Sequence, residues 1–194
     1  MDTAIHLPPL LKLKLDLTDE QFSQLCQRHP DLKFEHTAEG DLIIMSPTGG
    51  ETGDRNSELN FQIRAWNRQT KMGKVFDSST GFKLPNGAIR SPDTAWVSLE
   101  QWNALTLDER ETFLPLCPDF VVELMSPSDS VDKVREKMRE YQDNGAKLGW
   151  LINRKAQHVE IYRPSQPIEV LPSPQTLSGE DILPGLTLDL TGIL

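Results

Sequence analysis

The sequence predicts an α/β fold in which a mixed sheet is flanked by helices. Two short runs at 91–97 and 118–125 are rich in β-branched and aromatic residues, which is typical of strands. The segment 131–144 instead repeats its apolar residues at the helical period. Between two further apolar stretches, Asn86-Gly87 is a strong hairpin signal. Strands mixed with helices in this order favour a layered α/β domain over a doubly wound nucleotide-binding fold.

The N-terminal part is expected to contain an arm, a short helix and a hairpin. Residues 1–17 hold two prolines and alternating leucines, which indicates an arm or an edge strand. Thr18 and Gln21 have the spacing of a capping box, so a helix is expected over 18–28. Residues 32–45 predict a hairpin that turns at 38–41. We therefore expect an N-terminal arm at 1–17 and a single domain at 18–194.

The middle of the chain predicts the first core helix at 53–70, followed by strands near 74–76 and 82–84. The hairpin turn at Asn86-Gly87 is expected to lead into the strand that carries Asp93. The loop at 46–50, before the predicted core helix, is short and lacks the lysine of a phosphate-binding P-loop.

The C-terminal part predicts a second hairpin from strands at 148–153 and 159–163, with Trp150 in the core. The proline-rich segment 164–174 and the segment 183–186 are expected to form irregular strands at the rim of the sheet.

Two acids, Asp93 and Glu123, lie on the strand-like runs at 91–97 and 118–125. An ionised carboxylate inside a buried strand is costly unless something compensates its charge. Because side chains alternate along a strand, Glu123 is expected to share a face with Val121 and Met125. Two acids on neighbouring strands would repel each other, and a divalent cation bound by their oxygens would relieve that repulsion. For either acid alone, a solvated position at a strand end is the more common explanation.

Lys137 lies on the predicted helix beside an apolar stripe about 80° wide. The stripe consists of Val131, Val134, Met138 and Tyr141. Lys137 is about 40° from Tyr141, so it can bury its stem and extend its ammonium toward the sheet. There it could hold a phosphate oxygen or position an attacking water. Lys133 lies further round and is expected in solvent. From spacing alone, a surface lysine that packs on Tyr141 is the more common case.

Composition excludes several classes of protein. No apolar run approaches the roughly 20 residues that cross a membrane, and residues 1–6 lack the pattern of a signal peptide. Cys26 and Cys117 are isolated thiols, which suits a reducing cytoplasm. The four histidines are scattered and do not favour a zinc site. We therefore expect a cytoplasmic protein with no membrane partner.

The net charge of −9 argues against a protein that coats nucleic acid indiscriminately, but the charges are unevenly distributed. The segment 64–90 holds one acid, Asp77, whereas the segment 157–194 is mostly acidic. The basic residues of the first segment are Arg64, Arg68, Lys71, Lys74, Lys83 and Arg90. A basic face could position a phosphate backbone, although an ordinary solvated surface explains the pattern equally well.

An ordered set of motifs spans roughly residues 18 to 190. It comprises Phe34-Glu35, Gly40 to Pro47, Pro92-Asp93, Val122 to Ser128, Lys137 with Tyr141, Gly149 to Ile152 and Val159 to Arg163. No single motif is specific, but the ordered set resembles the Uma-type family of presumed endonucleases. This family is abundant in cyanobacteria and falls within the PD-(D/E)XK superfamily.

The resemblance implies a restriction-endonuclease-like core and metal-assisted cleavage of phosphodiester bonds. Asp93 and Glu123 would be the metal ligands, with Mg²⁺ or Mn²⁺ as the cofactor. The common superfamily lysine would fall at Met125, whereas Uma-type proteins place a lysine on the following helix, where Lys137 matches it. Glu35 matches the family's early glutamate.

The resemblance leaves several points open. Many superfamily members add an acid from the first core helix, and here either Glu58 or Glu51 could supply it. Nucleic acid is the implied partner, with DNA the first expectation, and a homodimer remains open. The alternative function is a non-catalytic member of the same fold that binds nucleic acid or protein.

Overall fold

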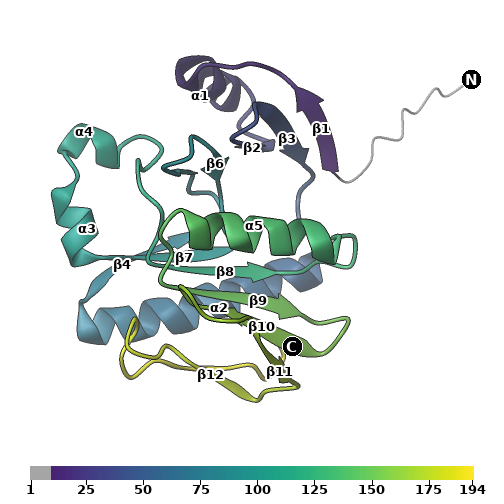
Figure 1. Ribbon diagram of the computed structural model, residues 1–194, viewed down its shortest axis with the longest axis vertical. Helices are drawn as coiled ribbons and strands as arrows, with labels where there is room; N and C mark the ends of the chain where they lie inside the picture. Colours follow the sequence, from purple (N-terminus) through teal and green to yellow (C-terminus); the bar gives the residue numbers. More distant parts are fainter. Residues whose placement is uncertain (1–9) are drawn as a thin grey trace, which may run out of the picture.

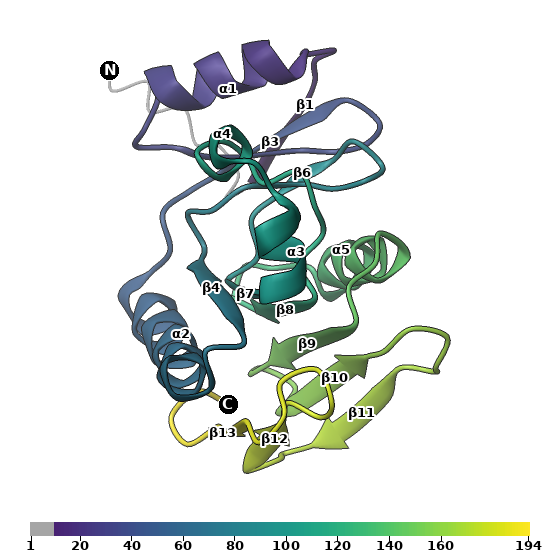
Figure 2. The same ribbon diagram turned by 90° about the vertical axis from the view of Figure 1, so that its left-hand side faces the viewer.

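The computed structural model describes residues 10–194 and contains two main sheets with helices around and between them (Figure 1). Seen from the side, the layers follow one another from α1 through the smaller sheet, α5 and the larger sheet to α2 (Figure 2). The helices are α1 (Asp19–Arg28), α2 (Gly50–Thr70), α3 (Leu99–Ala104), α4 (Leu107–Arg110) and α5 (Val131–Asp143). No helix in this part of the chain is both long and apolar enough to cross a bilayer.

The larger sheet has the strand order β11-β10-β9-β8-β7-β4. Its strands are β4 (Gly73–Asp77), β7 (Thr94–Ser98), β8 (Phe120–Leu124), β9 (Leu148–Asn153), β10 (His158–Tyr162) and β11 (Glu169–Pro172). Strands β8 and β9 run parallel, and the other neighbours in this sheet run antiparallel. A parallel pair needs a crossover connection, which α5 supplies between β8 and β9.

The two faces of this sheet are covered by different helices. Val122 and Leu124 of β8 join the core that contains Leu59 and Ile63 of α2. Val121 and Met125 instead join the core that contains Met138 and Tyr141 of α5. Because side chains alternate along β8, the side chain of Glu123 lies on the α5 face, as predicted from the sequence.

The smaller sheet is antiparallel and has the order β1-β3-β2-β6-β5. Its strands are β1 (Leu10–Lys14), β2 (Lys33–His36), β3 (Asp41–Met45), β5 (Phe82–Lys83) and β6 (Ile89–Arg90). Phe22 of α1 packs on it with Phe34, Leu42 and Ile89. The predicted α1 helix, its Thr18–Gln21 capping box and the β2–β3 hairpin are confirmed. Strand β1 pairs with β3 at the sheet edge, whereas residues 1–9 of the expected arm lie outside the described residues.

The middle of the chain differs from the prediction in three places. The turn at Asn86-Gly87 forms, with Gly87 at a φ of 90°, but it joins β5 to β6 in the smaller sheet. Asp93 lies beyond this hairpin, one residue before β7. Helix α2 begins at Gly50 rather than at Gly53. Helices α3 and α4 were not predicted, although Ser98 and Thr106 cap them with side-chain hydrogen bonds.

The C-terminal segment closes the α2 face of the larger sheet. The β9–β10 hairpin is confirmed, and Trp150 is fully buried. Strands β12 (Thr176–Ser178) and β13 (Thr187–Asp189) form a separate pair. The predicted rim strand at 183–186 was wrong. Leu183 and Leu186 are buried turn residues, and the Trp66 indole donates a hydrogen bond of 3.0 Å to the carbonyl of Pro184.

Candidate active site

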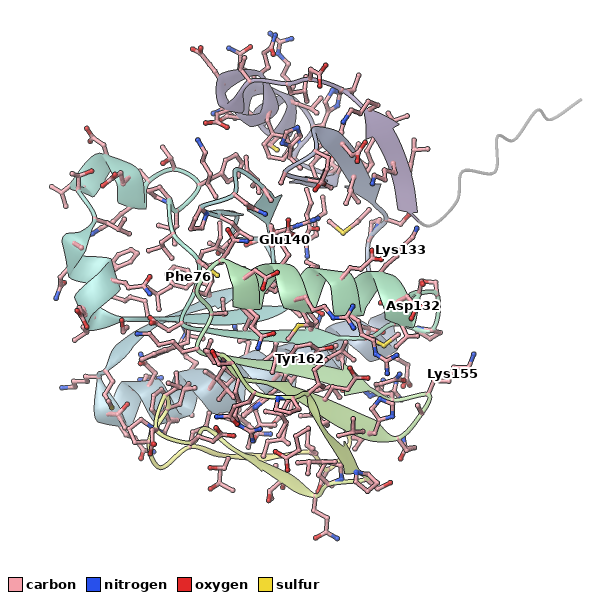
Figure 3. The ribbon with its side chains drawn as sticks, in the orientation of Figure 1. Phe76, Asp132, Lys133, Glu140, Lys155 and Tyr162 are labelled. Carbon is pink, nitrogen blue, oxygen red and sulfur yellow. The ribbon has the colours of Figure 1, made fainter. Side chains whose placement is uncertain are left out.

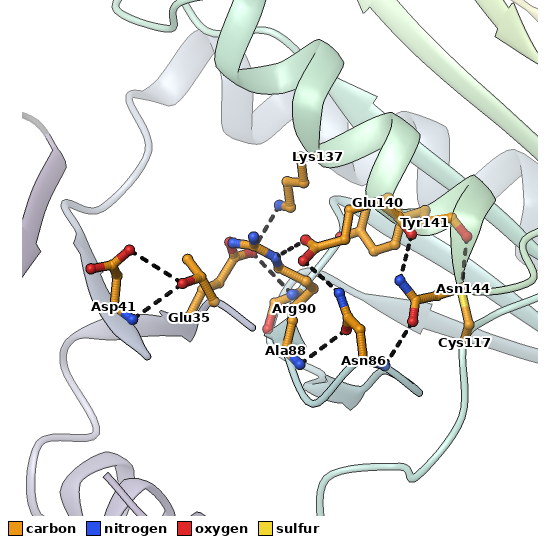
Figure 4. Close-up of polar contacts among 12 residues, drawn as sticks. Glu35, Asp41, Asn86, Ala88, Arg90, Cys117, Lys137, Glu140, Tyr141 and Asn144 are labelled. Carbon is orange, nitrogen blue, oxygen red and sulfur yellow. Dashed lines mark hydrogen bonds and ion pairs between the residues drawn. The ribbon is translucent and has the colours of Figure 1, made fainter. Parts of the chain in front are cut away.

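A lysine bridges two glutamates at the junction of α5, β2 and β8. The Nζ atom of Lys137 lies 2.8 Å from Oε1 of Glu35 (Figure 4). It also lies 2.8 Å from Oε1 of Glu123. The Lys137 side chain retains 16% of its solvent exposure, so this ammonium is largely shielded from water. Lys137 therefore extends toward the sheet, as its position on the helix predicted. Lys133 is exposed, as expected.

Tyr141 links the same helix to the same acid. It follows Lys137 by four residues, which places the two side chains on one face of α5. The lysine Nζ atom lies 5.8 Å from the centre of the Tyr141 ring, and the tyrosine hydroxyl donates a hydrogen bond of 3.1 Å to Oε1 of Glu123. One carboxylate oxygen of Glu123 thus receives both an ammonium and a hydroxyl.

Glu35 on β2 is held by groups from the neighbouring strand and by α5. Its carboxylate accepts hydrogen bonds from the Ser91 backbone N–H at 3.0 Å and from Arg90 at 3.1 Å. Arg90 also pairs with Glu140 of α5 at 2.5 Å. Burial alone would raise the pKa of Glu35, but the charges of Lys137 and Arg90 lower it to about 2. Glu35 is therefore ionised at neutral pH.

Glu123 is in the opposite electrostatic situation. Burial raises its pKa, and the charge of Lys137 only partly opposes that effect. The nearby carboxylates of Asp93 and Glu35 raise it further, to about 7. The raised pKa of Glu123 therefore comes mainly from burial, with the two neighbouring acids adding to it.

Asp93 immediately precedes β7 and lies next to Glu123. Thr94 pairs with Val122 across the two strands, so the register places Asp93 opposite Glu123. One Asp93 oxygen accepts a hydrogen bond of 2.9 Å from the backbone N–H of Leu124. Burial raises the pKa of Asp93, despite the opposing charges of nearby lysines. The two acids expected to bind metal are therefore adjacent, with Glu123 buried and Asp93 half-buried.

The residue of α2 that reaches this cluster is Asn56, which the sequence interpretation missed. Its amide nitrogen donates a hydrogen bond of 3.1 Å to Oδ1 of Asp93. The helical period contained the signal, because Asn56 precedes Leu59 by three residues and Ile63 by seven, on the buried face of α2.

The two acids considered for this helix lie elsewhere. Glu51 is exposed and pairs with Arg55 at 2.6 Å, and Glu58 accepts a hydrogen bond of 3.0 Å from Gln62. Neither forms a hydrogen bond or ion pair with Asp93, Glu123 or Lys137 within residues 10–194. The structure thus brings Glu35, and not Glu51 or Glu58, to the cluster.

The predicted basic segment is smaller than its sequence suggested. Arg90 is buried in ion pairs with Glu35 and Glu140, so its assignment to a basic surface was wrong. Lys83 pairs with Asp19 of α1. The exposed basic residues that remain are Arg64, Arg68, Lys71 and Lys74.

The chemistry of the cluster fits a hard divalent cation. Four acids surround two cationic side chains; the acids are Glu35, Asp93, Glu123 and Glu140, and the cations are Arg90 and Lys137. The Oδ1 atom of Asn56 is buried and has no hydrogen-bond partner in the described structure. Across residues 10–194, no three His, Cys, Asp or Glu side chains converge as a complete ligand set. Mg²⁺ commonly uses one or two carboxylates and fills its remaining positions with water and phosphate, so Asp93 and Glu123 suffice.

The structure is thus a mixed α/β domain in which acids from two neighbouring central strands meet a lysine from helix α5. The model of the Uma2 family, described as "Putative restriction endonuclease", matches residues 19–191, and the chain belongs to this family. The family and the mixed α/β fold predicted from the sequence are thereby confirmed.

A solved structure supports the same architecture. The crystal structure of "a putative nuclease belonging to DUF820" from Anabaena variabilis matches with a TM-score of 0.74 and 22% sequence identity. The match covers 91% of this chain and 97% of that chain. At this level of identity the likeness establishes the fold. A search of curated proteins found no match.

Proposed function

We propose that this protein is a magnesium- or manganese-dependent nuclease that hydrolyses phosphodiester bonds, with DNA as the expected substrate and the cytoplasm as the expected setting. The observation that carries the proposal is the Lys137 ammonium held between Glu35 and Glu123, with the half-buried Asp93 opposite Glu123. The family match independently supports a nuclease.

Asp93 and Glu123 are the residues that would hold the cation. When bound, the cation would polarise the phosphoryl group and lower the pKa of a bound water. The raised pKa values of Asp93 and Glu123 are consistent with this assignment, because burial disfavours the charge of each carboxylate and a bound cation would offset that cost.

Lys137 acts as a fixed positive charge. Burial lowers its pKa, but the charges of Glu123 and Glu35 outweigh burial and raise the pKa above its ordinary value. A lysine that stays protonated cannot accept a proton from water. Its role is therefore to hold a phosphate oxygen or to orient the attacking water. Glu35 fixes the position of this ammonium, and Tyr141 fixes the carboxylate of Glu123.

One observation favours the alternative, a non-catalytic interaction module. The Lys137 ammonium already satisfies one oxygen of Glu123 at 2.8 Å, so the cluster has an internal counter-charge without a metal. In this alternative the ion pairs would only join α5 to the smaller sheet.

A cleavage assay separates the two functions. Plasmid and single-stranded DNA are incubated with the protein in Mg²⁺, in Mn²⁺ and in chelator, using wild type, Asp93→Asn and Asp54→Asn. Asp54 is an exposed acid of α2 and provides the matched control. We expect metal-dependent cleavage by wild type and Asp54→Asn, and loss of cleavage in Asp93→Asn. Equal cleavage by both variants, or none by wild type, would contradict the nuclease proposal.

A further inference from the structure

A cavity lies at the carboxyl ends of the parallel strands β8 and β9. It has a volume of about 620 Å³, within the ordinary range for small-ligand sites. One wall is the loop between β8 and α5, and the other is the turn after β9. The lining residues that matter here are Met125, Ser126, Asp129, Val131, Arg154 and Lys155.

Arg154 differs from the three arginines that are held by acids in the structure. Arg90, Arg135 and Arg163 each bind a carboxylate within 2.5–2.7 Å. The Arg154 guanidinium pairs with no carboxylate in the described part of the chain, and its Nε atom has no hydrogen-bond partner there. An arginine that lines a cavity without an acid partner keeps its charge for a ligand in that cavity.

The acid in this cavity does not neutralise Arg154. The Asp129 carboxylate accepts a hydrogen bond of 2.7 Å from the backbone N–H of Ser126, which is a local turn contact. Lys155 is exposed and adds a second positive charge to the same wall. Figure 3 shows Lys155 at the β9–β10 turn, on the same side of that view as Asp132 at the start of α5. The cavity therefore offers two available cations in a chain of net charge −9.

The first turn of α5 favours the same kind of ligand. Ser130 is its N-cap residue, but the Ser130 side chain makes no capping hydrogen bond. Val131, the first residue of this 13-residue helix, lines the cavity. Backbone N–H groups at such a position attract anions, which adds to the two cations.

The cavity lies close to the acid–lysine cluster. Met125 follows Glu123 by two residues and lies on the same face of the sheet, which separates them by about 7 Å along the chain. The Met125 end of the cavity is thus near Glu123, whereas Arg154 lies beyond the last residue of β9.

We propose that this cavity binds a phosphate group of a nucleotide unit, with Arg154 as the main contact and Lys155 as a second. Arginine's planar group of donors matches phosphate oxygens better than a lysine does. If the cavity holds the nucleotide next to the cleaved bond, the assignment rests on the proposed nuclease function. Binding of a free nucleoside monophosphate does not depend on that function.

The test measures binding of deoxyadenosine 5′-monophosphate by isothermal titration in the presence of chelator, where no cleavage can occur. We expect wild type to bind it and Arg154→Gln/Lys155→Gln to bind at least tenfold more weakly. Arg28→Gln/Arg139→Gln is the matched control, because it removes the same number of positive charges at exposed positions away from the cavity lining. It should bind as wild type does. Deoxyadenosine, which lacks the phosphate, should not bind measurably.

The outcomes separate this inference from the nuclease proposal. No binding by wild type, equal binding by wild type and the Arg154/Lys155 variant, or equal binding of deoxyadenosine would overturn the inference. A thermal melt of each variant excludes loss of fold as the cause of weak binding. Arg154-dependent binding without DNA cleavage under any metal condition would sustain the phosphate site and contradict the nuclease proposal.

Discussion

Asn56 of α2 donates a hydrogen bond of 3.1 Å to Asp93. This bond links the helix on one face of the larger sheet to the acid that precedes strand β7. The second Asp93 oxygen is held by the backbone of Leu124 on β8. Asp93 is thus oriented from two elements, and Asn56 is the side chain that fixes it. A metal ligand oriented in this way depends on its hydrogen-bonded partner.

The first prediction concerns this pair. Asn56→Ala should weaken Mn²⁺ binding by about 10–100-fold, because Asp93 loses the group that orients it. Isothermal titration with Mn²⁺ measures the effect. Asn103→Ala, at an exposed position of α3, is the control. Mn²⁺ affinity unchanged in Asn56→Ala would show that Asn56 does not position a ligand.

The second prediction concerns the stability provided by Lys137. Lys137→Ala should lower the free energy of unfolding by roughly 3–5 kcal/mol, because it leaves Glu35 and Glu123 buried without their shared counter-charge. Lys133→Ala should change it by less than about 0.5 kcal/mol, because Lys133 is exposed. Urea unfolding at pH 7 compares the two. Equal stability of both variants would mean that the buried bridge contributes nothing to folding.

The third prediction is a pH dependence that Glu35 causes. Its pKa is about 2 in the folded protein and 4.5 ordinarily, so the unfolded chain binds more protons between these values. Stability from Glu35 is therefore fully present above pH 4.5 and is lost as pH falls toward 2. The difference corresponds to roughly 3 kcal/mol. Urea unfolding of wild type and Glu35→Gln between pH 3 and 6 should show a stability gap that narrows as pH falls. A gap that is constant over this range would contradict the assignment.

The fourth prediction concerns the cation. Mg²⁺ or Mn²⁺ should raise the melting temperature, because an ion that binds only the folded protein stabilises it. Asp93→Ala should abolish the shift, and Asp54→Ala should retain it. A melting temperature that rises equally in both variants would place the ion elsewhere.

The sequence predicted the strand next to Asp93, the strand that carries Glu123 and the helix that carries Lys137. Alternation and helical period are local properties of the chain, so they can be recognised without the fold. It could not predict that Glu35 and Arg90 meet α5, since that contact depends on how the smaller sheet packs on the helix. Arg90 looked like a surface charge for this reason. The buried turn containing Leu183 and Leu186 was missed similarly, because its burial comes from α2, more than a hundred residues away in sequence.

The last prediction concerns the approach of nucleic acid. Arg68, Lys71 and Lys74 are exposed at the end of α2 and the start of β4, whereas Arg90 and Lys83 are engaged in ion pairs. Replacing these three residues with glutamine should weaken DNA binding to a similar extent for unrelated sequences, because phosphate contacts carry no sequence information.

The salt dependence gives the decisive measurement. Removing one phosphate contact should reduce the slope of log affinity against log salt by about 0.9, so the slope of the triple variant should be smaller by roughly 2–3. Asp93→Asn should keep the wild-type slope while losing cleavage, because it removes a metal ligand and leaves the basic residues in place. Filter binding at several salt concentrations, in chelator, compares the three proteins. If the triple variant binds with wild-type affinity and slope, the exposed charges on α2 and β4 are only a solvated surface. The Arg154 cavity would then be the first place to look for the contact with the phosphate backbone.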